Sequence, residues 1–396
     1  QELTLKAAGR ISDYGSGAGE TGRVEAWNVS GLWAPIEDVR FRANLSRAIR
    51  APTPSNLFSP QTVNFLFFDD PCDVDFIDQG TANRAANCLA DGVPAGFDES
   101  ITGNRAVLQG GNQLLSAETS DSFTAGIIFQ PTFLPGFSVS ADYYDIEVES
   151  VIANVGPQAI LNNCYDAVDL NNSFCGQIFD RQADGSLQTD AALITGPVNF
   201  AKLTAEGVDI DARYSHTFEN GNRLQLRAIA TYVIDRTNFL DTDNPEIPDD
   251  DRGELGDPIW AANFNVAYTF ADDFTLSWAG RYVGPQFIGA RENYRNSIQP
   301  CNADGTVPRT SDTCTPGTLV EAPPLNPDAF PQERYPSRFT QDIRLDIQAT
   351  EQFRFTVGVD NVTDKQPPFG LTGAGGGSGI FDNRGRTVFA VVRYEM

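Results

Sequence analysis

Short segments in which apolar and polar residues alternate recur along the whole chain. In the segment 38–46, the apolar residues occupy odd positions from Val39 to Leu45, and the polar residues occupy even positions from Arg40 to Ser46. Because successive side chains of a strand point to opposite faces, each such segment predicts a β-strand with one apolar and one polar face. We expect twelve strands, at about 2–12, 22–35, 38–50, 118–131, 135–150, 197–217, 222–236, 258–271, 273–287, 337–350, 352–362 and 384–396.

The connections between these strands are alternately very short and very long. Tight turns are expected near 35–37, 132–134, 219–222, 271–273 and 350–352, and long connections over about 51–117, 151–196, 237–257, 288–336 and 363–383. Short periplasmic turns and long extracellular loops are typical of a transmembrane antiparallel β-barrel. A soluble sandwich also alternates, but it has no reason to collect every long loop at one end. No apolar run approaches the roughly 20 residues of a membrane-spanning helix, so we assign the chain to the all-β class.

Aromatic residues gather near the expected strand ends. Their placement suits the girdles that mark the two membrane interfaces, although a general preference of aromatic residues for strands is the alternative. The residues concerned are Trp27, Trp33, Tyr143, Tyr268, Trp278, Tyr282 and Tyr394. We expect the apolar faces, with Val39, Phe41, Leu276 and Trp278, to contact lipid, and Arg40, Arg42, Ser277 and Arg281 to point inward.

The chain is strongly acidic, with a net charge of −25. Nucleic acid is excluded as a partner, because phosphate binding requires a basic surface. The acidic residues concentrate in the long loops, where they form either a solvated, repulsive surface or a site for Ca²⁺, which prefers several oxygen ligands. The residues that could hold Ca²⁺ are Asp241, Asp243, Asp249, Asp250 and Asp251.

Six cysteines fall into three local pairs, each within one long loop: Cys72 with Cys88, Cys164 with Cys175, and Cys301 with Cys314. Pairing within each loop is the simplest of the fifteen connectivities that six cysteines permit. Disulfides require an oxidising compartment, which the bacterial cell surface provides. A zinc site is not indicated, because no pair has the C-x₂-C spacing and the chain has one histidine.

No arrangement of catalytic residues is apparent. A Ser-His-Asp triad would have to use His216, which shares the apolar face of its strand close to the turn at 219–222. HExxH, Walker and nucleophile-elbow motifs are absent from the sequence. The sequence therefore predicts a protein that is not an enzyme.

Four segments together resemble TonB-dependent outer-membrane receptors. The segment FRANLSRAIRAP at 41–52, followed by NLF at 56–58, is similar to the family's "SRxxRAP…ELF" strand end. GNQLLSAETS at 111–120 is similar to its "GNPxLxPExS" strand start, with Gln113 and Ala117 where prolines are usual. GVDNVTDK at 358–365 resembles its "NLFDK" segment, and GRTVFAVVRY at 385–394 resembles its closing strand, although the last residue is Met396 rather than Phe.

The resemblance implies a barrel of twenty-two strands whose N-terminal plug fills the lumen and contacts TonB. Residues 1–396 would then be the C-terminal portion of the barrel, from the eleventh strand onward, with the plug and the earlier strands absent from this sequence. The implied function is active import of a scarce nutrient, such as a glycan or a siderophore, across the bacterial outer membrane, in contact with lipid and lipopolysaccharide. A passive porin of twelve strands and a barrel subunit or scaffold in a larger outer-membrane assembly are the alternatives.

The loops also contain aromatic residues close to asparagines. Rings beside amides suit flat or sugar-like ligands, although the rings would equally serve to pack the loops together. The candidate ligand-binding residues are Phe65, Phe67, Phe68, Tyr165, Phe174, Tyr294 and Phe381. Haem is not expected, because the loops lack a histidine ligand, and the acidic loops favour a neutral glycan or a Ca²⁺-assisted ligand over an anionic ferric siderophore.

Overall fold

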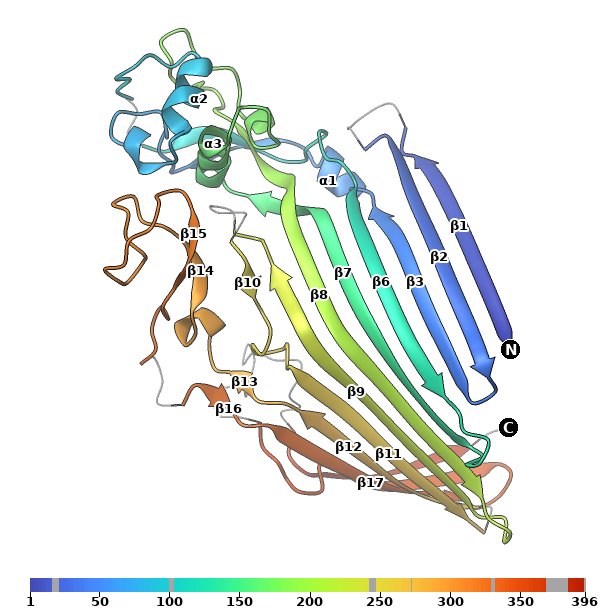
Figure 1. The fold of residues 1–396 in the computed structure, drawn as a ribbon. Coiled ribbons are helices and arrows are strands. Elements are labelled where there is room, and N and C mark those ends of the chain that lie inside the picture. The colour runs from blue at the N-terminus through green and yellow to red at the C-terminus, as the bar shows by residue number, and fades with distance from the viewer. Residues whose placement is uncertain are drawn as a thin grey trace.

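The computed structural model describes residues 1–15, 21–99, 103–241, 247–271, 273–328, 332–367 and 384–394. Twelve antiparallel strands form one curved sheet in which each strand pairs with its neighbours in the chain (Figure 1). They are β1 (Glu2–Asp13), β2 (Arg23–Ile36), β3 (Val39–Arg50), β6 (Glu118–Phe129), β7 (Phe137–Val155), β8 (Ile194–Thr217), β9 (Arg223–Asn238), β11 (Trp260–Phe270), β12 (Phe274–Val283), β17 (Arg338–Gln348), β18 (Phe353–Asp360) and β19 (Thr387–Tyr394). Among the described helices, none has the length and apolar character to cross a membrane.

All twelve predicted strands are confirmed, and their ends differ from the prediction by up to a few residues. β7 continues past its predicted end to Val155, and β8 begins before its predicted start, at Ile194. The pairing of these two strands shifts register near Val151. β12 is shorter than predicted, because Gln286–Phe287 leave the sheet and form a separate strand, β13, that pairs with β16 (Arg334–Tyr335).

The long connections contain elements that the alternation did not predict. These are α1 (Pro54–Phe58), β4 (Thr62–Leu66), η1 (Ile77–Gln79), α2 (Arg84–Ala90), β5 (Arg105–Gln109), α3 (Pro157–Asp166), η2 (Cys175–Gln177), β10 (Asp249–Asp250), η3 (Arg291–Asn293), β14 (Ser297–Pro300) and β15 (Leu319–Ala322). Short loop elements of this kind depend on contacts between loops, which a period of two cannot reveal.

The strand register keeps the two predicted faces apart. Leu276 lies opposite Leu345, whereas the next residue, Ser277, lies opposite Arg344. On the same apolar face, between β2 and β3, Phe41 stacks on Trp33 with 5.6 Å between ring centroids. The predicted alternation of apolar and polar faces is therefore confirmed.

The tight turns close one end of the sheet. In the turn after β8, the Phe218 amide donates to the Asn222 carbonyl at 2.8 Å, and Gly221 has a φ of 85° that a side chain would disfavour. Aromatic rings collect on the apolar face here: His216 stacks on Tyr214 and meets Phe218 edge-on, 4.6 Å between centroids. An interfacial role of the aromatic residues near the turns stays a prediction.

Within the described residues, the two outer edges of the sheet are unpaired. Within the described part of the chain, no ladder joins β1 to β19, although the other members of the twelve each pair on both sides. The described residues therefore form an open, curved sheet.

Candidate functional site

The long connections after β3 and β7 fold together into a compact cap, which we define as residues 51–117 and 151–196. Figure 1 shows α2 and α3 of this cap at the end of the sheet opposite the tight turns. In the cap, β4 pairs with β5, and β5 pairs in parallel with the first residues of β8, Leu108 opposite Ile194. The cap is thus joined to the twelve-stranded sheet by strand pairing.

An apolar core holds the cap together. Its fully buried side chains come from both connections and include Val107, Ile160, Leu161, Leu187 and Leu193. Strand residues also contribute to this core, because Val107 of β5, Val155 of β7 and Val198 of β8 are buried in it.

The three predicted disulfides are confirmed. Cys72–Cys88 and Cys164–Cys175 lie in the cap core, and Cys301–Cys314 closes part of the connection after β12. Among the described residues there is no free cysteine.

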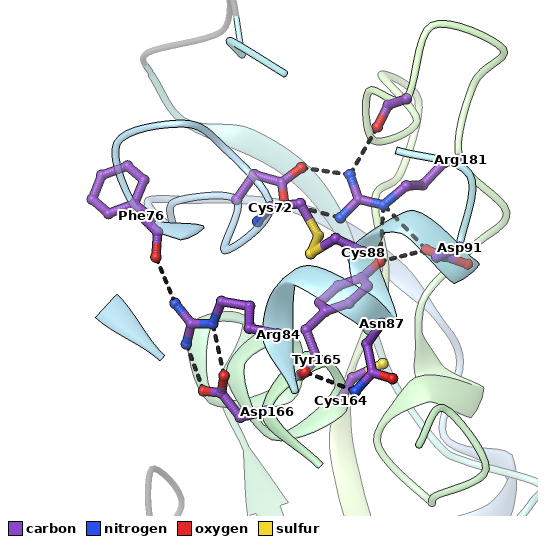
Figure 2. Close-up of a disulfide and its surroundings, with 12 residues drawn as sticks. Cys72, Phe76, Arg84, Asn87, Cys88, Asp91, Cys164, Tyr165, Asp166 and Arg181 are labelled. Atoms are coloured by element: carbon purple, nitrogen blue, oxygen red, sulfur yellow. Dashed lines mark hydrogen bonds and ion pairs between the residues drawn. A yellow bond between two sulfur atoms is a disulfide. The ribbon is translucent and has the colours of Figure 1, made fainter. Parts of the chain in front are cut away.

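A buried ionic network joins the two connections of the cap (Figure 2). The guanidinium of Arg181 donates to both carboxylate oxygens of Asp70, at 2.6 and 2.9 Å, and its side chain is 2% exposed. It also donates to the Tyr165 hydroxyl at 2.8 Å, and that hydroxyl donates to Asp91 at 2.5 Å. Burial raises the pKa of the Tyr165 phenol. A second bridge, Arg84 to Asp166 at 2.5 Å, ties the same two connections.

The aromatic candidates separate into two groups. Phe65 and Phe67 are 62% and 75% exposed, so a ligand could reach them. Phe68, Tyr165 and Phe174 are buried in the cap core, and Tyr294 is buried against Phe287 in the connection after β12. For these four the alternative of loop packing applies, and Phe381 lies outside the described residues. A role of Phe65 and Phe67 in ligand binding stays a prediction.

The acidic candidates for Ca²⁺ have different partners in the structure, and a Ca²⁺ site at these residues stays a prediction. Asp250 forms an ion pair with Arg291 at 2.5 Å, and Asp249 and Asp251 both accept a hydrogen bond from Asn238. Asp241 lies in the preceding segment, and Asp243 is outside the described residues. The structure instead brings Asp249 close to Glu254 and Glu292, with ligand oxygens all within 4.8 Å of one another. The sequence reasoning missed the two glutamates, because they lie outside the aspartate run.

This acidic group has an unusual protonation equilibrium. Burial, together with the nearby charges of Glu292, Asp249 and Asp251, raises the pKa of Glu254 to about 7, even though the Arg291 amide donates to its carboxylate at 2.6 Å. Burial also raises the pKa of Glu292.

The cap presents an acidic surface. Its basic side chains, Arg84, Arg105 and Arg181, are all buried in ion pairs. Its exposed aspartates form no ion pair within the described residues; they are Asp69, Asp75, Asp78, Asp98, Asp169, Asp180, Asp184 and Asp190. An anionic molecule approaching the cap would therefore be repelled.

The polar face of the sheet carries paired charges. Arg42 donates to both oxygens of Asp142, at 2.6 and 2.5 Å, and Asp211 accepts from Arg213 and Arg227 at 3.0 Å each. These residues line one hollow on this face.

Comparison with known proteins places these features in a family. The chain matches the family model described as TonB-dependent receptor-like β-barrel over residues 1–362. Among solved structures it is similar to the siderophore receptor PirA from Acinetobacter baumannii, with 16% identity and a TM-score of 0.56 over 99% of this chain and 43% of that chain. A mutant of the ferric enterobactin receptor PfeA from Pseudomonas aeruginosa, in complex with enterobactin, gives 16% identity and a TM-score of 0.53 over 99% and 43%.

At this identity the two structures show a shared fold alone, and the chain spans less than half of their length. A search of curated protein sequences gave no match.

Proposed function

The chain belongs to the TonB-dependent receptor-like β-barrel family, whose members are bacterial outer-membrane proteins, and from this premise we propose that it forms part of an active importer. The proposed importer takes up a scarce nutrient, such as a glycan or a siderophore, with energy transmitted by the TonB complex. The match of residues 1–362 to this family is the observation that carries the proposal. The outward apolar face would contact lipid and lipopolysaccharide.

The unpaired edges of the sheet support the proposal that further strands complete the barrel. An unpaired strand edge in hydrocarbon costs several kcal/mol for each exposed backbone group. β1 and β19 would therefore pair with strands outside these residues, and an N-terminal plug would occupy the lumen and contact TonB. The charged residues of the polar face, Arg42, Asp142 and Asp211, would then bind the plug or line water.

Uptake measured with the complete gene product in its own bacterium tests the function. A deletion strain and a complemented strain would be grown with a ferric siderophore as the iron source or with neutral oligosaccharides as the carbon source. We expect complementation to restore growth on one of these nutrients, and expect loss of TonB or collapse of the proton-motive force to abolish uptake of the labelled nutrient.

The two alternatives give different outcomes. Uptake that persists without TonB would overturn active import and support the passive porin. Recovery of the protein in a stoichiometric complex, with no nutrient whose uptake depends on it, would support the scaffold.

A further inference from the structure

A hollow of about 480 Å³ lies where the cap meets the extended ends of β7 and β8. Its volume is within the range of about 300–1,000 Å³ that is usual for small-molecule sites. The polar residues that line it are Ser55, Asn56, Ser59, Gln109, Asn154 and Thr195. Unlike the acidic surface around it, the hollow has no charged residue among those that line it.

Two amide side chains in the wall of the hollow are fixed by internal hydrogen bonds. The Asn56 Oδ1 accepts from the backbone amide and the hydroxyl of Thr53, at 3.0 and 2.5 Å. The Gln109 Oε1 accepts from Asn64 at 3.2 Å. In the described structure the NH₂ groups of Asn56 and Gln109 have no partner, so both are oriented donors available to a ligand.

Two further groups lack partners. The side chain of exposed Asn154 makes no hydrogen bond within the described residues. Thr195 is 3% exposed, and its Oγ1 is buried without a hydrogen-bond partner. A buried polar group normally finds a partner, because leaving it unpaired costs free energy. The Thr195 oxygen is itself covered, so the groups that the wall offers to a ligand are the uncharged amides of Asn56, Gln109 and Asn154.

The backbone of this wall requires glycine. A Cβ atom on Gly196 would lie 2.5 Å from the Gly110 carbonyl oxygen, and Gly196 has a φ of 146°, which side chains disfavour. Both glycines line the hollow, where they let the backbones of the β5 end and the β8 start approach each other closely.

From these observations we infer that the hollow binds a neutral, polyhydroxylated ligand, the sugar unit of a glycan. A hydroxyl group both donates and accepts, which matches the mixed amides and hydroxyls of the wall. The lining lacks the cation that an anionic ligand would require, and the exposed aspartates of the cap repel anions. The inference rests on the proposed function and names its substrate class.

Binding of neutral trisaccharides to the purified complete protein tests the inference. Maltotriose, cellotriose, mannotriose and xylotriose would be titrated calorimetrically up to millimolar concentration, with trigalacturonic acid as the anionic counterpart. We expect at least one neutral trisaccharide to bind and the acidic one not to bind. Asn154→Ala and Gln109→Leu should each weaken binding by about tenfold or more, because a ligand hydroxyl loses its partner.

Asn171→Ala is the matched control, because Asn171 is an exposed asparagine of the same cap that does not line the hollow. Asn154→Ala, at an exposed side chain without a hydrogen bond in the described structure, keeps the test decisive should Gln109→Leu fail to fold, and thermal unfolding checks each protein. Absence of binding to all four neutral sugars, or binding that the hollow variants leave unchanged, overturns the inference. If the inference fails in this way, TonB-dependent uptake of a different nutrient would leave the proposed function intact. Conversely, sugar binding without TonB-dependent uptake would overturn the proposed function and leave the inference about the hollow intact.

Discussion

Adjacent residues of β18 allow the assignment of the two faces to be tested at one depth in the membrane. Val357 lies opposite Leu345 and Ala390 and is 45% exposed, on the face assigned to lipid. Thr356 points to the other face, where its hydroxyl donates to the Asp346 carboxylate at 2.5 Å. We expect Val357→Arg to destabilise the barrel strongly and Thr356→Arg to have a small effect.

The size of the effect follows from the position of Val357. It is near the middle of a strand that runs from Phe353 to Asp360, so it lies close to the centre of an apolar band about 25 Å tall. An arginine on the lipid face costs roughly 2–4 kcal/mol at the midplane, which corresponds to a loss of roughly 30-fold to several-hundred-fold in the folding equilibrium. On the polar face, Asp346 would neutralise the new guanidinium of Thr356→Arg.

The assay is reversible urea unfolding of the complete protein in phospholipid vesicles, followed by tryptophan fluorescence. The two variants carry the same new side chain at the same depth, so the comparison isolates the face. Equal destabilisation by both, or greater destabilisation by Thr356→Arg, would refute the assignment of the faces.

Four further predictions concern the loops. Arg181→Met should destabilise the cap by about 3–5 kcal/mol, because it leaves Asp70, whose side chain is 0% exposed, as an unpaired buried charge. Hydrogen exchange of the cap measures this loss of stability. We expect the double variant with Asp70→Leu to recover the stability of the cap. Replacing Cys72 and Cys88 by serine should lower the free energy of unfolding by about 3 kcal/mol, as the loop-closure model predicts. Non-reducing peptide maps that show a different pairing would contradict the assigned bridge. The pKa of Glu254 is raised from 4.5 to about 7 in the folded state, so the folded state binds this proton more tightly than the unfolded state does. The local stability of the loop should therefore fall as the pH rises from about 4.5 to 7. Hydrogen exchange of the loop should show this pH dependence in the wild-type protein and not in Glu254→Gln. If the carboxylates of this loop bind Ca²⁺, added Ca²⁺ at pH 8 should slow hydrogen exchange of the loop in the wild-type protein and not in Glu254→Gln.

The strands and their faces could be predicted because each depends on local sequence. A period of two, as from Val39 to Leu45, fixes which side chains share a face, and an unbroken apolar alternation permits one register. The cysteine pairs were also predictable, because each partner lies 11 to 16 residues away within one connection.

The candidate sites depend on contacts between segments that are far apart in the sequence. Arg181 meets Asp70 across 111 residues, and nothing in the local pattern around either residue signals that contact. The same holds for Tyr165, whose burial in the cap core and hydrogen bond to Arg181 depend on a segment that the local pattern around it does not reveal. Glu254 and Glu292 likewise approach each other only because two different connections fold together.

The sequence by itself therefore determined the all-β class, the order and phase of the strands, the division into turns and long loops, and the disulfides. Tertiary structure alone decided which loop residues are buried, which charges are neutralised, and where an uncharged hollow opens beside Asn154 and Thr195. The physical reason is that side-chain alternation is a property of one strand, whereas burial and pairing in loops are set by the other segments that pack against them.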